Sequence, residues 1–232
     1  MPKSEAAAQE DWAAHLARQE ARYRDGEARL GSAAETGGAD ADVRQRQLTR
    51  LGNAAGGAGL SLLMLGRNEQ AAEWLARAAE RYRESFRDAP PGSWGRPIGM
   101  LKARLLAGDW DAAREEATWT LDEGAGATES PIGRYAACLA NLVLERWDDA
   151  RVLADSLRLD AGFPHDVGDA LAFIAARDRL GYAEAAERVL GSFETREEYL
   201  EDIPLADTVL VLQALAARRD IAAELDSPLL PD

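Results

Sequence analysis

The sequence predicts an all-α protein, built as a right-handed α-solenoid of antiparallel helix pairs. Ala, Leu, Arg and Glu dominate the 232 residues and β-branched residues are sparse, which favours helices. Four internal prolines are spaced 34, 33 and 40 residues apart, and an apolar, Ala-rich segment follows each: Pro97, Pro131, Pro164 and Pro204. Proline suits the first position of a helix, because the N–H it lacks would have no intrahelical partner there. A period in the mid-thirties is typical of helix-pair repeats.

We expect one helical-repeat domain over residues 1–232, because the length and the 47% apolar fraction suit a single core. About four helix pairs should lie between an N-terminal helix and a C-terminal capping helix. The expected segments are an N-terminal helix at 4–30, pairs at 43–91, 97–123, 131–159 and 164–201, a capping helix at 204–225 and a tail at 226–232.

The N-terminal helix has a narrow apolar stripe. Trp12, Leu16, Tyr23 and Leu30 follow one another at offsets of 4, 7 and 7 residues, which places them on one helix face. Leaving large aromatic side chains exposed costs free energy. We therefore expect this helix to pack on the array.

Residues 59–90 resemble a tetratricopeptide repeat. The residues that match the family pattern are Leu62, Leu65, Gly66, Ala78, Tyr82 and Pro90. In physical terms, Gly66 permits a tight turn between helices, Ala78 lets two backbones approach, and Tyr82 fills the wedge between helices. The resemblance implies a solenoid whose first helices form a concave binding face.

Later repeats keep this construction. Trp110, Trp147 and Tyr182 each stand near the start of a second helix, and we expect them to pack between helices. Acidic residues in the first turns suit the positive end of the helix dipole, so capping explains them better than metal binding. The Gly-rich run 52–59 lacks the Lys-Ser/Thr of a phosphate loop and is interpreted as a site of close helix packing.

Composition excludes several classes of function. The formal net charge of −14 repels nucleic acid and acidic membrane surfaces. Cys138 is the only cysteine, so an intramolecular disulfide is impossible, and its apolar surroundings predict a buried side chain. No cofactor, metal or catalytic motif is evident. We expect a cytoplasmic protein, since neither a signal segment nor a long apolar run is found.

One candidate site is an edge formed by the N-termini of the first helices. Such termini present free N–H groups, and Arg96, Arg134 and His165 would add cationic side chains there. The edge would suit a carboxylate or a phosphate. The alternative is that the arginines pair with nearby acids such as Glu129 or Asp166 and that His165 caps a helix.

A second candidate site follows from the resemblance. Carried over by register, the concave face would include Leu63, Arg67, Lys102 and Leu105. Four polar or amphipathic residues within apolar first helices could line the same face: Tyr135, Asn141, Asp169 and Arg177. Buried polar groups need partners, so a structural network is an equally good interpretation.

The segment 209–215 near the C-terminus is apolar nearly all round, so something must cover it. The apolar tail 227–231 could do so, or a second subunit could, which would make a homodimer.

The function expected is non-enzymatic binding of a protein or peptide partner, because extended concave surfaces are what such arrays provide. The alternative is a sensor of a small molecule or anion.

Overall fold

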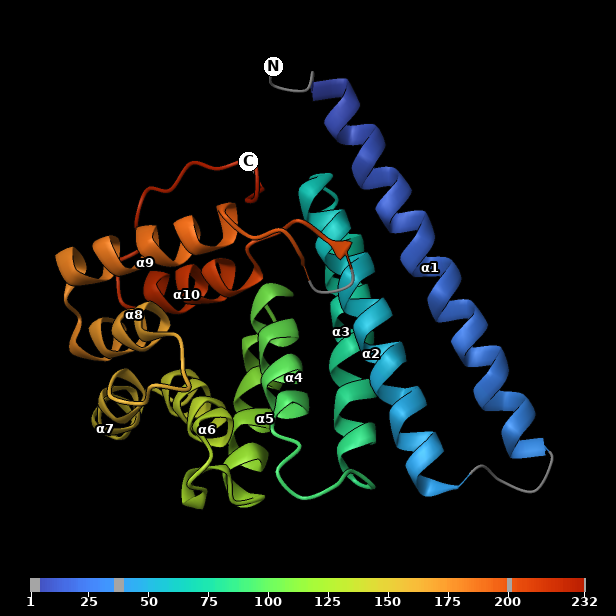
Figure 1. Cartoon of the computed structure of the whole chain (residues 1–232), viewed down its shortest axis with the longest axis horizontal. Helices are drawn as coiled ribbons and strands as arrows, with labels where there is room; N and C mark the ends of the chain where they lie inside the picture. The colour runs from blue at the N-terminus through green and yellow to red at the C-terminus, as the bar shows by residue number, and fades with distance from the viewer. Residues whose placement is uncertain (1–4, 36–39, 200–201, 232) are drawn as a thin grey trace. The chain divides into compact units, whose positions relative to one another are not determined.

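A computed structural model describes residues 5–35, 40–199 and 202–231, and every regular element in these residues is helical (Figure 1). The all-α prediction is therefore confirmed. The chain divides into two compact units, which are described one at a time. Unit 1 comprises the described residues of 1–103, 198–204 and 231, and unit 2 comprises 104–197 and 205–230.

Unit 1 contains three long helices and most of a fourth. They are α1 (Glu5–Glu35), α2 (Ala41–Met64), α3 (Asn68–Phe86) and α4 (Gly95–Leu106), the last of which crosses the unit boundary. Helix α2 packs against both α1 and α3. Trp12 and Leu16 are buried, and the Tyr23 ring lies edge-on to Trp74 of α3 at 5.2 Å between centroids. The packing predicted for the N-terminal helix is therefore confirmed.

Tyr82 of α3 fills the wedge between α2 and α4, as its position predicts. A Cβ added at Gly52 or at Gly99 would lie 2.8 Å from the Tyr82 ring, so both positions require glycine. The Tyr82 hydroxyl donates to Asn53 Oδ1 at 2.9 Å. Gly66 lies in the middle of the connection between α2 and α3 with a φ of 67°, a conformation that favours glycine.

Unit 2 is a succession of shorter helices in which each of α5 to α9 packs against the next. The elements are α5 (Trp110–Asp122), the short 3₁₀ helix η1 (Ala125–Ala127), α6 (Pro131–Val143), α7 (Trp147–Arg158), α8 (His165–Ala176), α9 (Arg179–Glu194) and α10 (Asp207–Ala217). Pro131 opens α6 and Pro164 is the N-cap of α8, whereas Pro97 is the third residue of α4. Pro204 lies three residues before α10 begins.

Helix α10 is covered by its own chain. Val209, Val211, Leu212 and Leu215 are buried. The tail lies beside the start of this helix, because the N–H of Ala206, the N-cap residue of α10, donates to Leu229 C=O at 3.0 Å. These apolar side chains, which the sequence predicted to need a cover, are therefore buried within the single chain.

The described helices include none with the length and apolar composition needed to cross a membrane.

Candidate functional site

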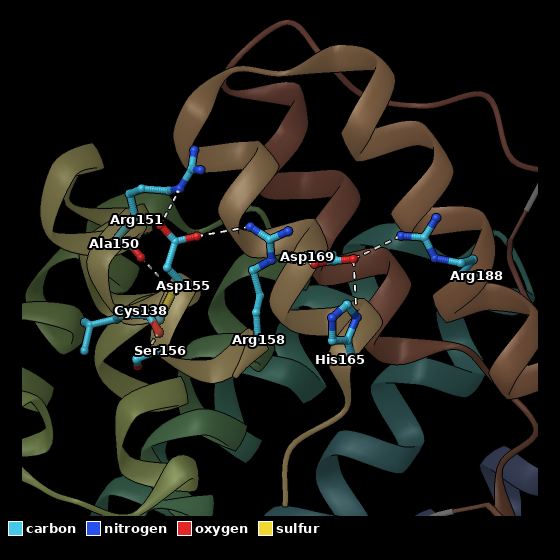
Figure 2. A network of polar contacts seen from close by, with 10 residues as sticks. Cys138, Ala150, Arg151, Asp155, Ser156, Arg158, His165, Asp169 and Arg188 are labelled. Atoms are coloured by element: carbon cyan, nitrogen blue, oxygen red, sulfur yellow. Dashed lines mark hydrogen bonds and ion pairs between the residues drawn. The ribbon is translucent and has the colours of Figure 1, made fainter. Parts of the chain in front are cut away.

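Asp169 of α8 joins three helices of unit 2. Its side chain is only 8% exposed. Arg158 of α7 donates from Nε to Oδ1 at 2.6 Å, and Arg188 of α9 donates from a terminal nitrogen to Oδ2 at 3.2 Å (Figure 2). A buried carboxylate is stable only when its charge is compensated. Asp169 therefore holds α7 and α9 to the helix between them.

Local sequence explains this close approach. Gly168 precedes Asp169, and a Cβ at that position would lie 3.0 Å from the backbone nitrogen of Arg158. The absence of a side chain lets the C-terminal end of α7 lie against α8. Arg158 then reaches the carboxylate and also covers the Phe173 ring, with 5.5 Å between the guanidinium carbon and the ring centroid.

Charges alternate along the network on both sides of Asp169. Asp155 accepts from Arg158 at 3.2 Å and from Arg151 at 2.9 Å, and Asp166 accepts from Arg188 Nε at 2.7 Å (Figure 2 shows the Asp155 side). Burial acts to lower the pKa of Arg158, but its bonds to Asp169 and Asp155 outweigh burial and raise it. The hydrogen bond to Asp166 is the main cause of the raised pKa of Arg188.

His165, Asp166 and Asp169 are the one group in the described residues whose side chains could jointly hold a metal ion. Their ligand atoms lie within 4.8 Å of one another. His165 Nδ1 lies 3.4 Å from Asp169 Oδ2. However, guanidinium groups already contact both oxygens of Asp169 and one of Asp166. The arrangement therefore fits a cluster of ion pairs better than a metal centre.

One of the three residues predicted to form a cationic edge, Arg96, lies in unit 1. Its Nε donates to Thr49 Oγ1 at 3.0 Å and a terminal nitrogen donates to Gln45 Oε1. Burial lowers the pKa of Arg96. Both of its described partners are uncharged.

The other two residues of that edge lie in unit 2, and each contacts a carboxylate. Arg134 pairs with Asp160. His165 is the first residue of α8 and lies beside Asp169. Arg134 thus pairs with an acid of its own chain, as the alternative interpretation expected, but that acid is Asp160 and not Glu129 or Asp166.

Among the residues predicted for a concave face, Tyr135 and Asn141 are buried inside α6. The Tyr135 ring lies 5.3 Å from that of Phe163, and Asn141 Nδ2 donates to Ala137 C=O at 2.9 Å. Burial is the main cause that raises the pKa of the Tyr135 phenol, and Asp207 adds to it. Lys102 is half-buried on α4.

Arg177 ends α8 with a φ of 55°. Its Nε donates to Arg219 C=O at 3.1 Å, and a terminal nitrogen donates to Asp220 Oδ2 at 3.1 Å. It therefore ties the end of α8 to the chain that follows α10. The partners given by these contacts do not include Asp169.

Two arginines at the C-terminal end of α10 cover tryptophans of the second helices. The guanidinium carbon of Arg218 lies 5.0 Å from the Trp110 ring centroid, and that of Arg219 lies 4.1 Å from the Trp147 ring centroid. Arg218 also pairs with Glu145, after the end of α6, at 3.1 Å. The sequence carries no signal for these contacts, because a helix pattern does not show which distant arginine reaches a ring.

The outward faces of α7 and α9 carry exposed apolar side chains. Val152 is 71% exposed, Leu159 is 88% exposed and Leu180 is 79% exposed. Val152 and Leu159 are seven residues apart and so share one helix face. Sequence reasoning missed them because it assigned ligand binding to the first helices, whereas in unit 2 most residues of the first helices α6 and α8 are buried.

Neither a protein-family model, nor a curated protein, nor a solved structure matches this chain.

Proposed function

We propose that the protein is a non-enzymatic, right-handed helical-repeat module of about four helix pairs that binds a protein or peptide partner. Support for the repeat comes from the sequential packing of the helices in each unit. The dense salt-bridge cluster around Asp169 supports a structural role for its titratable groups, since their charges are already compensated within the chain.

The observation that carries this proposal is the exposure of Val152 on α7 and of Leu159, the residue that caps the C-terminal end of that helix. Single exposed apolar residues are ordinary on a protein surface. Val152 and Leu159 are each more than 70% exposed and stand seven residues apart, so together they offer a partner two apolar side chains to bury. Burying side chains of this size stabilises a complex by about 1.5–3 kcal/mol each before the costs of association.

Site-specific photocrosslinking tests the proposal. A photoreactive amino acid is placed at position 152 or 159 of the full-length protein, and at Glu80 on α3 as an exposed control. Irradiation in a lysate of the source cells should yield a discrete protein adduct from positions 152 and 159 and none from position 80. The absence of an adduct at both position 152 and position 159, or identical adducts at all three positions, contradicts the proposal.

An anion-sensing function is the alternative from the sequence. Its support is weaker, because Arg134 and His165 both contact carboxylates of their own chain.

A further inference from the structure

We propose that the outward faces of α7 and α9 bind a basic amphipathic segment of another protein. This inference rests on the proposed protein-binding function and adds the surface and the chemistry of the partner. We define the acidic–apolar surface as Asp148 and Val152 of α7, Leu159 at its C-cap, and Leu180, Glu184 and Glu187 of α9.

Each helix contributes apolar anchors and carboxylates on one face. On α7, Asp148 precedes Val152 by four residues, and Leu159 follows Val152 by seven. On α9, Glu184 and Glu187 follow Leu180 by four and seven residues. These spacings place side chains on the same side of a helix. The surface therefore offers apolar contacts with acidic groups beside them.

The carboxylates of this surface are available to an external cation. Asp148, Glu184 and Glu187 are exposed, and none of them makes an ion pair with any residue that the structure describes. Nearby acids differ in this respect: Asp155 and Asp166 are already bound by arginines. Asp148, Glu184 and Glu187 are thus exposed acids without an ion-pair partner among the described residues, as Asp149 next to them in α7 also is.

The Asp169 contacts hold the two helices together. Leu159 directly follows Arg158, and Glu187 directly precedes Arg188. Both arginines donate to the single carboxylate of Asp169, at 2.6 and 3.2 Å. A surface held in this way loses little conformational entropy when a partner binds.

Charge complementarity selects the occupant. The net charge of −14 and the unpaired acids favour a partner rich in Lys or Arg. A second copy fits poorly, because a two-fold contact would set each acidic patch against itself. Phosphate backbones and anionic lipids are repelled by the same charges.

Defined peptides test the chemistry of the partner. The probe is a fluorescein-labelled, 18-residue amphipathic helix with Leu on one face and Lys and Arg elsewhere. One matched peptide replaces Lys and Arg by Glu, and another replaces Leu by Ser. Fluorescence anisotropy with the full-length protein should show that the basic Leu peptide binds. Both matched peptides should bind with an affinity that is lower by about tenfold or more.

Protein variants locate the binding surface. V152S/L159S should weaken binding of the basic Leu peptide by roughly tenfold or more, since it removes two apolar anchors. D148N/E184Q/E187Q should weaken binding by a few-fold and flatten its dependence on salt concentration. The matched controls in unit 1 are V43S, which alters an apolar residue 51% exposed, and E80Q; each should leave affinity within about twofold of the original.

Three results would overturn the inference: equal binding of the acidic peptide, equal binding of the Ser peptide, or an effect of V43S as large as that of V152S/L159S. Melting curves recorded by circular dichroism confirm that each variant is folded. If crosslinks from positions 152 and 159 capture a partner while the basic peptide does not bind, the inference fails and the proposed function stands. If no partner is captured at all, the proposed function itself fails.

Discussion

Arg158 Nε and Asp169 Oδ1 lie 2.6 Å apart, and their hydrogen bond fastens the end of α7 to α8. Asp169→Asn removes the negative charge and leaves Arg158 and Arg188 facing a neutral amide. Removing one partner of a buried ion pair costs about 3–5 kcal/mol, and we expect about 2 kcal/mol here because both arginines are partly exposed. Urea denaturation measures the change. D148N, at an exposed site, should change the free energy of unfolding by less than about 0.5 kcal/mol, and equal stability of the two variants contradicts the assignment.

Gly52 and Gly56 lie one turn apart on α2 and provide a matched pair. A Cβ at Gly52 would lie 2.8 Å from the Tyr82 ring, whereas at Gly56 the nearest atoms lie at 3.9 Å. Gly52→Ala should therefore lower the free energy of unfolding by about 1–3 kcal/mol through overpacking. Gly56→Ala should raise it by about 0.5–1 kcal/mol, because alanine is the better helix former. Thermal unfolding of both variants tests this, and a shift of the same sign in both contradicts the role of Tyr82.

The buried phenol of Tyr135 and the buried thiol of Cys138 should make the stability of the protein sensitive to alkaline pH. Burial raises the pKa of both groups above their unfolded values, which are about 10 for Tyr and about 8.5 for Cys. The folded state then retains protons that the unfolded state releases. The contribution of these two groups to the free energy of unfolding is therefore complete below a pH of about 8.5, and it is lost as the pH rises beyond that value.

Urea denaturation from pH 7.5 to 10.5 measures this fall. Cys138→Ala should flatten the decline between about pH 8.5 and 10, and Tyr135→Phe should flatten it above about pH 10. Profiles parallel to that of the original protein would show that these groups do not set the alkaline limit.

The stacked arginines fasten the end of α10. Arg218 lies over Trp110 and Arg219 over Trp147, and such contacts contribute about 0.5–1 kcal/mol each at partly exposed sites. Arg218→Ala/Arg219→Ala should therefore speed amide hydrogen exchange in 207–217 about five- to thirtyfold, while exchange in α3 stays unchanged. Hydrogen-exchange mass spectrometry measures both regions at once. Unchanged protection of α10 would show that apolar burial alone holds it.

Local features of the sequence predicted the helices because they act within one helix or turn. Alanine-rich segments, the proline that opens α6 and the positive-φ glycine at position 66 each bias the backbone where they stand. The close packing at Gly52 and the wedge filled by Tyr82 were also predictable, since they involve helices that follow one another directly along the chain. The burial of Cys138 followed from its apolar surroundings.

The candidate site was predictable only in part. Asp169 stood out as an acid within an apolar helix, but its partners lie 11 and 19 residues away on two other helices. A single helix pattern shows which residues share a face and leaves open which neighbour covers that face. For the same reason Tyr135 and Asn141, predicted as candidates for a binding face, lie buried in α6.

The sequence by itself determined the all-helical class, the acidic charge and the places where helices begin and turn, because backbone preference and charge are properties of the residues themselves. Only the tertiary structure decided which charges are compensated and which apolar side chains remain in water. Arg218 reaches Glu145 across 73 residues, and Leu159 stays exposed although Leu157, two residues before it, is buried. These outcomes depend on how helices pack against one another, since a charge is compensated, or an apolar group covered, by whatever lies next to it in space.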